Sequence, residues 1–125
     1  MKRHTIRIIL AATLFGAMTL AACGGGGTPA PTPTPLEIKI DSTEFRFDPN
    51  TITVKVGQPV RVLVTNTGAL EHTFTIEDLD VDEPTPIGKT VTVEFTPTKS
   101  GTFELICTVP GHKEAGMVGT VVVNP

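Results

Sequence analysis

The stretch that decides the fold is GTFELICTVPGHKEAGMVGTVVV, residues 101–123. It opens with a run that alternates apolar and other residues up to Cys107, and it closes with a run rich in valine. Both patterns are typical of strands with a buried face. Between them lies a segment with Pro and Gly, and Cys107, His112 and Met117 follow one another at intervals of five residues. The sequence therefore predicts two strands joined by a loop, with one potential metal donor, Cys107, at the end of the first strand and two more, His112 and Met117, on the loop.

The rest of the chain from Leu36 onward has the same character. Short β-branched and apolar runs are separated by Gly, Pro, Asn and Asp, and no helical period is sustained over three turns. The predicted strands are Leu36–Asp41, Thr43–Phe47, Thr51–Val56, Pro59–Asn66, His72–Ile76, Thr90–Phe95, Thr102–Cys107 and Val118–Val123. Only 77–88 is expected to form a long loop. About eight strands in residues 36–125 predict one all-β domain, a two-sheet sandwich.

The N-terminal 35 residues have the composition of a targeting segment and a spacer. Basic residues precede an uncharged stretch, which predicts that residues 1–22 are an export signal. The sequence LAAC, ending at Cys23, resembles the bacterial lipoprotein signal and implies that Cys23 is cleaved free and acylated, so that lipid holds the chain on a membrane. Residues 23–35 then form a Gly/Pro-rich linker. We expect the protein outside the cytoplasm, anchored to the outer face of the cytoplasmic membrane or in the periplasm.

The net charge of the chain indicates which kinds of partner it could bind. The chain has 10 basic and 13 acidic residues, and loss of residues 1–22 removes Lys2, Arg3 and Arg7. The remaining domain is acidic, which argues against nucleic acid because phosphate binding requires Lys and Arg. The run EDLDVDE, residues 77–83, suits a basic partner that is steered by charge.

The potential donors form a set that suits copper. His72 shares the predicted inward phase of Phe74, so it is expected at an end of the sandwich, as is Cys107. If both lie at the same end, His72, Cys107, His112 and Met117 meet there. Two imidazoles, one thiolate and a weakly held thioether are the ligands of a trigonal copper site with a long axial bond. Thioether is an unusual zinc ligand, and structural zinc sites favour two or more cysteines.

At this point the chain resembles the cupredoxins of the plastocyanin and azurin type, in the run 101–123 and in KVGQPVRVLVTNTGALEHTFTI, residues 55–76. The four-residue spacings on either side of His112 are similar to those of the auracyanins, membrane-attached members of the family. The resemblance implies a Greek-key sandwich, with His72, Cys107 and His112 as strong ligands of one type 1 copper and Met117 as the axial ligand. Thr73 stands where the family often has Asn, and we expect it to hydrogen-bond toward Thr108.

We therefore expect a blue copper protein that shuttles single electrons, and not an enzyme, because the protein donors leave no open position for substrate. Expected partners are redox proteins such as a c-type cytochrome or a membrane oxidoreductase. We expect the protein itself to be a monomer. An apolar patch beside His112, with Ala69, Leu70, Pro110 and Ala115, is expected to receive them. A copper carrier or storage lipoprotein of the cell envelope and a metal-free scaffold domain remain as alternatives.

Overall fold

A computed structural model describes residues 33–125 of the chain. The predicted export signal, the acylation site at Cys23 and the linker up to residue 32 lie outside the described residues. Within the described residues, no helix is long and apolar enough to cross a membrane.

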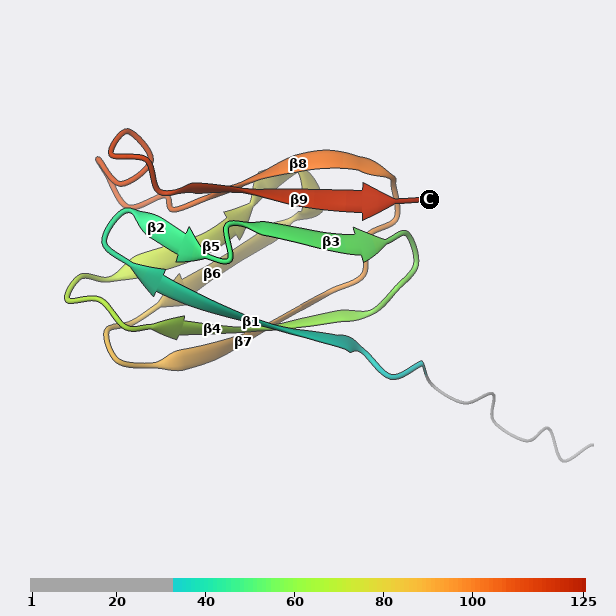
Figure 1. The fold of residues 1–125 in the computed structure, drawn as a ribbon, viewed down its shortest axis with the longest axis horizontal. Helices are drawn as coiled ribbons and strands as arrows, with labels where there is room; N and C mark the ends of the chain where they lie inside the picture. The colour runs from blue at the N-terminus through green and yellow to red at the C-terminus, as the bar shows by residue number, and fades with distance from the viewer. Residues whose placement is uncertain (1–32) are drawn as a thin grey trace, which may run out of the picture. The chain divides into compact units, whose positions relative to one another are not determined.

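Nine strands make up the domain, one more than the sequence predicts, and the all-β sandwich is confirmed (Figure 1). The strands are β1 (Leu36–Thr43), β2 (Arg46–Asp48), β3 (Thr51–Lys55), β4 (Val60–Asn66), β5 (His72–Ile76), β6 (Val81–Thr85), β7 (Thr90–Phe95), β8 (Gly101–Ile106) and β9 (Val118–Asn124). One sheet has the order β2-β1-β4-β7, and the other has the order β3-β9-β8-β5-β6. Two sheets of alternating strands bury their inner faces against each other.

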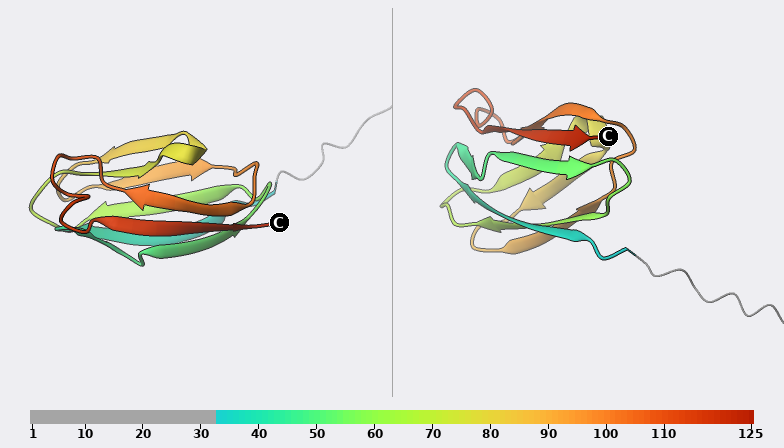
Figure 2. Two further views of the ribbon diagram at one scale, coloured as in Figure 1. Left: turned by 90° about the horizontal axis from the view of Figure 1, so that it is seen from above. Right: turned by 45° about the vertical axis from the view of Figure 1, so that its right-hand side comes forward.

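The connections bring three loops to one end of the sandwich. β8 and β9 are antiparallel neighbours, with Ile106 opposite Val118, so the residues between them project beyond the sheet at that end. The β4–β5 loop reaches the same end, because Asn66 closes β4 there and His72 opens β5. Both views in Figure 2 show the segment between β8 and β9 at the same end as the β4–β5 loop, with the β3–β4 turn at the other end.

The segment 77–88, predicted as a long loop, instead contains a 3-10 turn (Glu77–Leu79) and the edge strand β6. Its sequence, VDEPT, carries two acids and a proline, which strands disfavour. The structure shows why Pro84 is tolerated. Pro84 pairs with Thr73, whose N–H is directed toward Cys107 on the other side, so no ladder bond is required of Pro84. Proline is accepted at such positions on edge strands.

The predicted strand Thr43–Phe47 is also wrong in detail. β1 runs on through Thr43, the chain turns at Glu44 and Phe45, and β2 is a separate short strand. Phe45 has a φ of 60°, in the left-handed region that bulky residues rarely enter. The turn lies at the same end as the β4–β5 loop.

The core consists of the inward residues of both sheets, as their alternation predicts. Phe47 and Phe74 pack edge to face between the sheets, with ring centroids 6.0 Å apart. The other fully buried large side chains include Ile40, Val54, Val60, Val62, Val64, Ile76, Leu105 and Val121. The strands that carry the potential donors are thus anchored in a rigid apolar interior.

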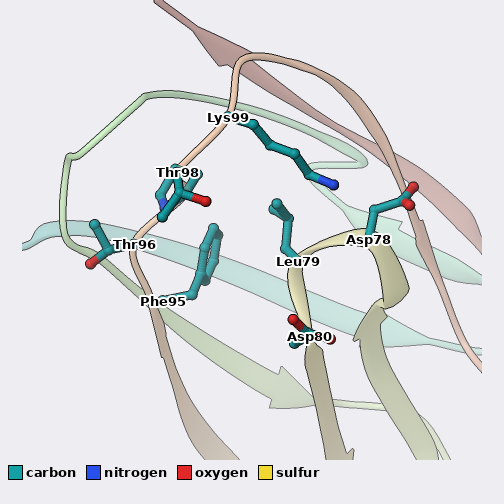
Figure 3. Close-up of a pocket in the computed structure, with 8 residues that line it drawn as sticks. Asp78, Leu79, Asp80, Phe95, Thr96, Thr98 and Lys99 are labelled. Atoms are coloured by element: carbon teal, nitrogen blue, oxygen red, sulfur yellow. The ribbon is translucent and has the colours of Figure 1, made fainter.

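A hollow of about 380 Å³ lies at the opposite end, between the 3-10 turn and the β7–β8 connection. Figure 3 shows Leu79 and Phe95 facing it, with Asp78, Asp80 and Lys99 around it. Phe95 pairs with Val60 at the end of the sandwich remote from Asn66 and His72. The hollow is therefore separate from the site described next.

Candidate metal centre

Three side chains, one from β5 and two from the β8–β9 connection, meet inside one end of the sandwich. His72 opens β5, Cys107 follows the last residue of β8, and His112 lies in the connection to β9. Their potential ligand atoms all lie within 4.8 Å of one another, and all three residues are buried. The two Nδ1 atoms of the histidines are 3.1 Å apart, and Cys107 Sγ lies 3.5 Å from His112 Nδ1. The distant imidazole at position 72 thus lies beside the sulfur.

Backbone hydrogen bonds hold the 107–117 segment as a compact loop. The N–H of His112 donates to the carbonyl of Val109, and the N–H of Met117 donates to the carbonyl of His112. The N–H of Cys107 in turn donates to the carbonyl of Met117 at 3.2 Å. Gly111 and Gly116 have φ values of 85° and 104°, in a region that glycine enters without the strain of a Cβ. The side chain of Met117 is fully buried in the core cluster that includes Cys107.

The sulfur of Cys107 accepts a hydrogen bond from the backbone N–H of Thr73 at 3.3 Å. In the reverse direction, the N–H of Thr108 donates to Thr73 Oγ1 at 2.8 Å, and the two threonine hydroxyls are 3.0 Å apart. The predicted bond between Thr73 and Thr108 is confirmed. The two residues that follow the potential donors therefore tie β5 to the end of β8.

The surroundings of His72 favour the neutral imidazole that metal binding requires. Burial lowers the pKa of His72, and the nearby His112 lowers it further, while Glu44 acts in the opposite direction. The Nε2 atom of His72 is buried and has no hydrogen-bond partner within the described residues. The two Nδ1 atoms and the Cys107 sulfur lie close together, so one metal ion could be bound by all three. Neutral imidazole and thiolate are the donors that copper accepts, and the residues fit that metal.

Two side chains that the sequence analysis missed fix the loop before His72. Asn66, buried at the end of β4, donates through Nδ2 to the carbonyls of Leu70 and Thr85, each at 2.8 Å. The carboxylate of Glu44 accepts hydrogen bonds from the N–H groups of Ala69 and Leu70. A Cβ at position 68 would lie 2.6 Å from Glu44 Oε1, so a side chain there would push the Glu44 carboxylate away from these N–H groups. These contacts join elements far apart in the sequence, and no local pattern announces them.

Phe45 is the other residue that the sequence did not indicate. Its ring meets the ring of His112 edge to face, with centroids 5.3 Å apart. It remains 41% exposed, whereas His112 is only 7% exposed. Phe45 thus covers one side of the His112 ring and contributes apolar surface beside it.

The carboxylate of Glu44 makes stability depend on pH. Hydrogen bonds from the backbone, foremost from Ala69, lower the pKa of Glu44 from its usual 4.5. A lowered carboxylate pKa stabilises the fold above pH 4.5, and this contribution is lost as the pH falls through the folded value. We expect Glu44→Gln to lower the melting temperature at pH 7, with the difference from the parent chain shrinking at pH 3. Glu37→Gln, at an exposed position of β1, is the control. If Glu44→Gln lowered the melting temperature by the same amount at pH 7 and at pH 3, the expectation would be contradicted.

The fold and the donor set together define the class. A cupredoxin-like domain model matches residues 7–123, and the chain belongs to this family. Among relatives, auracyanin-A of Chloroflexus aurantiacus is 34% identical over 160 residues, covering 96% of this chain and 98% of that protein. The copper-resistant cuproprotein CopI of Rubrivivax gelatinosus is 37% identical over 103 residues, covering 66% of this chain but only 62% of CopI. The solved structure of auracyanin A has a TM-score of 0.64 at 27% identity, covering 73% of this chain and all of that one.

Proposed function

We propose that the protein is a type 1 copper protein that carries single electrons. His72, Cys107 and His112 would hold the metal, with Met117 as the weak axial ligand. The observation that carries the proposal is the buried convergence of two imidazole nitrogens and one sulfur within 4.8 Å. When bound, copper supplies a one-electron couple, and the mixed donor set suits both oxidation states.

The chain's own residues supply a rigid and dry environment. The three donors are already together in the structure, so little reorganisation accompanies a change of charge. Buried strands and the hydrogen bonds of Thr73 and Thr108 fix the sulfur, while Phe45 covers one side of the His112 ring. Among the described residues the sequence offers one cysteine, two histidines and one methionine, and all four lie in this loop or beside it. This supports an electron carrier and not an enzyme, since no further soft donors remain for a second copper.

The relatives support this function and one alternative. The solved relative auracyanin A is described as a blue copper protein from a photosynthetic bacterium. CopI is named a copper-resistant cuproprotein, which favours copper carriage or storage by the same donors as the second candidate. The two functions differ in what the site does with its metal. An electron carrier retains copper in both oxidation states, whereas a carrier of copper releases it to an acceptor.

Titration of the purified chain with Cu(II) tests the proposal. We expect one equivalent to produce an intense visible thiolate-to-copper band, which ascorbate bleaches and ferricyanide restores over repeated cycles. Loss of copper to a Cu(I) chelator in each reduced phase would favour the storage function. No visible band at any Cu(II) concentration would reject the type 1 site.

The partner surface is proposed at the metal end of the sandwich. Among the described residues, five large hydrophobic side chains are exposed, and four of them lie at this end: Phe45, Leu70, Ile87 and Val118. The fifth, Val56, lies in the β3–β4 turn at the other end. Small redox complexes form over modest apolar patches, which suits a redox protein such as a c-type cytochrome that meets the monomer beside His112. The acids of 77–83 begin at the 3-10 turn beside the hollow, at the opposite end, so they lie outside this surface. Steering of a basic partner by these acids stays a prediction.

Placement in the cell is proposed from the N-terminal sequence. Export followed by acylation of Cys23 would tether the domain to the outer face of the cytoplasmic membrane, and residues 24–35 would act as the spacer. A tethered carrier remains close to membrane redox partners.

A charged side chain in the apolar patch should slow electron exchange. Leu70 is 45% exposed at the metal end, so Leu70→Glu places a hydrated carboxylate where the partner would have to remove water. We expect at least about a tenfold slower exchange with the partner, equivalent to about 1.4 kcal/mol of encounter energy, with an unchanged visible band. Val56→Glu is the matched control, since it adds the same charge at the far end. Equal rates in Leu70→Glu and Val56→Glu would reject this surface.

A further inference from the structure

A chain of hydroxyl groups crosses the outer face of the five-stranded sheet. It starts at the exposed carboxylate of Asp82 on β6, which accepts from Thr75 Oγ1 at 2.7 Å. Thr75 Oγ1 lies 3.0 Å from Thr73 Oγ1, its neighbour two residues back on β5. Thr73 Oγ1 then meets both the hydroxyl and the N–H of Thr108, at 3.0 and 2.8 Å. The chain therefore runs from a surface acid to the residue after Cys107.

The groups at the two ends of the hydroxyl chain, Asp82 and Thr108, determine which hydroxyl donates and which accepts at each step. An ionised carboxylate only accepts hydrogen bonds, so Thr75 must give its single hydroxyl proton to Asp82. Thr75 can then only accept from Thr73, which uses the one proton that Thr73 has. Thr73 Oγ1 is left with two lone pairs, and Thr108 supplies two donors for them, its hydroxyl and its N–H. Every lone pair and proton that the chain needs is thereby matched.

Thr73 accepts the hydrogen bonds of Thr108 and also donates one to the Cys107 sulfur. The N–H of Thr73 points to Cys107 Sγ, while its hydroxyl oxygen holds the backbone of Thr108. The side chain and the backbone of Thr73 thus hold Cys107 and Thr108 as one unit. Thr75 is buried, with 3% of its surface exposed, so its hydroxyl depends on Asp82 and Thr73 for partners. Removing either of these partners leaves the buried Thr75 hydroxyl with a hydrogen bond unmade, which costs about 1–3 kcal/mol.

We propose that Asp82 and Thr75 are positioning residues for Cys107, orienting the Thr73 hydroxyl so that Thr73 and Thr108 hold the sulfur and its N–H donor in place. The proposal rests on the proposed function in one respect, that Cys107 is the thiolate ligand. A hydrogen bond to a thiolate withdraws charge from it and favours the reduced metal, and loss of that bond favours Cu(II). Asp82 therefore acts on the redox couple through geometry, although its side chain lies on the surface.

Geometry and charge predict opposite signs for the potential. Removing a negative charge near the site favours Cu(I) and raises the potential, whereas loosening the bond to the sulfur lowers it. Thr75→Val is isosteric and changes no charge. Asp82→Ala removes both the charge and the acceptor, and Asp82→Asn removes the charge but keeps an acceptor oxygen. Asp80→Ala removes an equal charge from the same acidic run without touching the hydroxyl chain.

The experiment has a metal-free and a copper-loaded arm, both on the full chain. In the metal-free protein we expect the amides of Thr73 and Thr108 to exchange with deuterium at least about tenfold faster in Thr75→Val and Asp82→Ala, and at the parent rate in Asp82→Asn and Asp80→Ala. With copper, Thr75→Val should shift the ratio of Cu(II) to Cu(I) affinity about tenfold toward Cu(II) relative to the parent chain, the lower limit for outer ligand partners. Asp82→Ala should show the same shift relative to Asp82→Asn, which removes the same charge but keeps an acceptor. That shift lowers the potential by about 59 mV.

Two results would overturn the proposal: parent exchange rates in both Thr75→Val and Asp82→Ala, or an equal rise in potential in Asp82→Ala and Asp80→Ala. If Thr75→Val fails to fold, Asp82→Ala can still be measured, because it changes an exposed side chain. Because the exchange arm needs no metal, its outcome is independent of whether the parent chain shows the visible band.

Discussion

Replacing Cys107 by serine is expected to remove the visible band of the copper-loaded protein completely and to weaken Cu(I) binding by more than about 100-fold. The band depends on charge transfer from a soft thiolate, and a serine oxygen is a hard donor that remains protonated at neutral pH. Mutating residues that only hydrogen-bond to a metal ligand already lowers metal affinity about 10–100-fold, so loss of the ligand itself should lower it more. Absorption spectra during Cu(II) titration and competition with a Cu(I) chelator measure the two effects.

The chain contains its own control for this experiment. Cys23→Ser removes the only other cysteine, which lies in the N-terminal segment. We expect the purified Cys23→Ser protein to keep the full band and the parent affinity. A band that survives in Cys107→Ser, or one that is lost in Cys23→Ser, would show that the sulfur at position 107 is not the ligand.

Replacing Phe74 by alanine is expected to lower the free energy of unfolding by about 3–5 kcal/mol. Phe74 is fully buried on β5, two residues from His72, and packs edge to face on Phe47 of the other sheet. Its removal leaves a cavity between the sheets that the closely packed strands cannot fill. Small domains have a total stability of roughly 5–15 kcal/mol, so much of the margin would disappear.

Chemical unfolding of the metal-free protein measures this loss, and Ile87→Ala is the matched control. Ile87 is an exposed apolar side chain in the β6–β7 connection, and its truncation should change the free energy of unfolding by no more than about 0.5 kcal/mol. Similar losses in Phe74→Ala and Ile87→Ala would mean that the core between Phe47 and Phe74 is not what holds β5 in place.

The alternation of apolar residues predicted most of the sandwich correctly. Strands such as β3, β4 and β8 have one buried face and one exposed face, and a period of two leaves a clear trace in the sequence. β6 lacks that trace because it is an edge strand. Among residues 33–125 no further strand pairs with its outer edge, and the pairing of Pro84 with Thr73 needs no ladder bond, so acids and proline are accepted.

The sequence by itself determined which residues could meet at the site. Spacing placed Cys107 and His112 near each other along the chain and strand phase placed His72 at an end of the sandwich, while the resemblance to the cupredoxins implied that the three converge. Only the tertiary structure decided how that group is held. Glu44 binds the loop before His72, Phe45 packs on the His112 ring, and Asp82 ends the hydroxyl chain. These contacts join residues that are 7 to 67 positions apart. Such contacts depend on sheet order and register, for which a single sequence carries no local pattern.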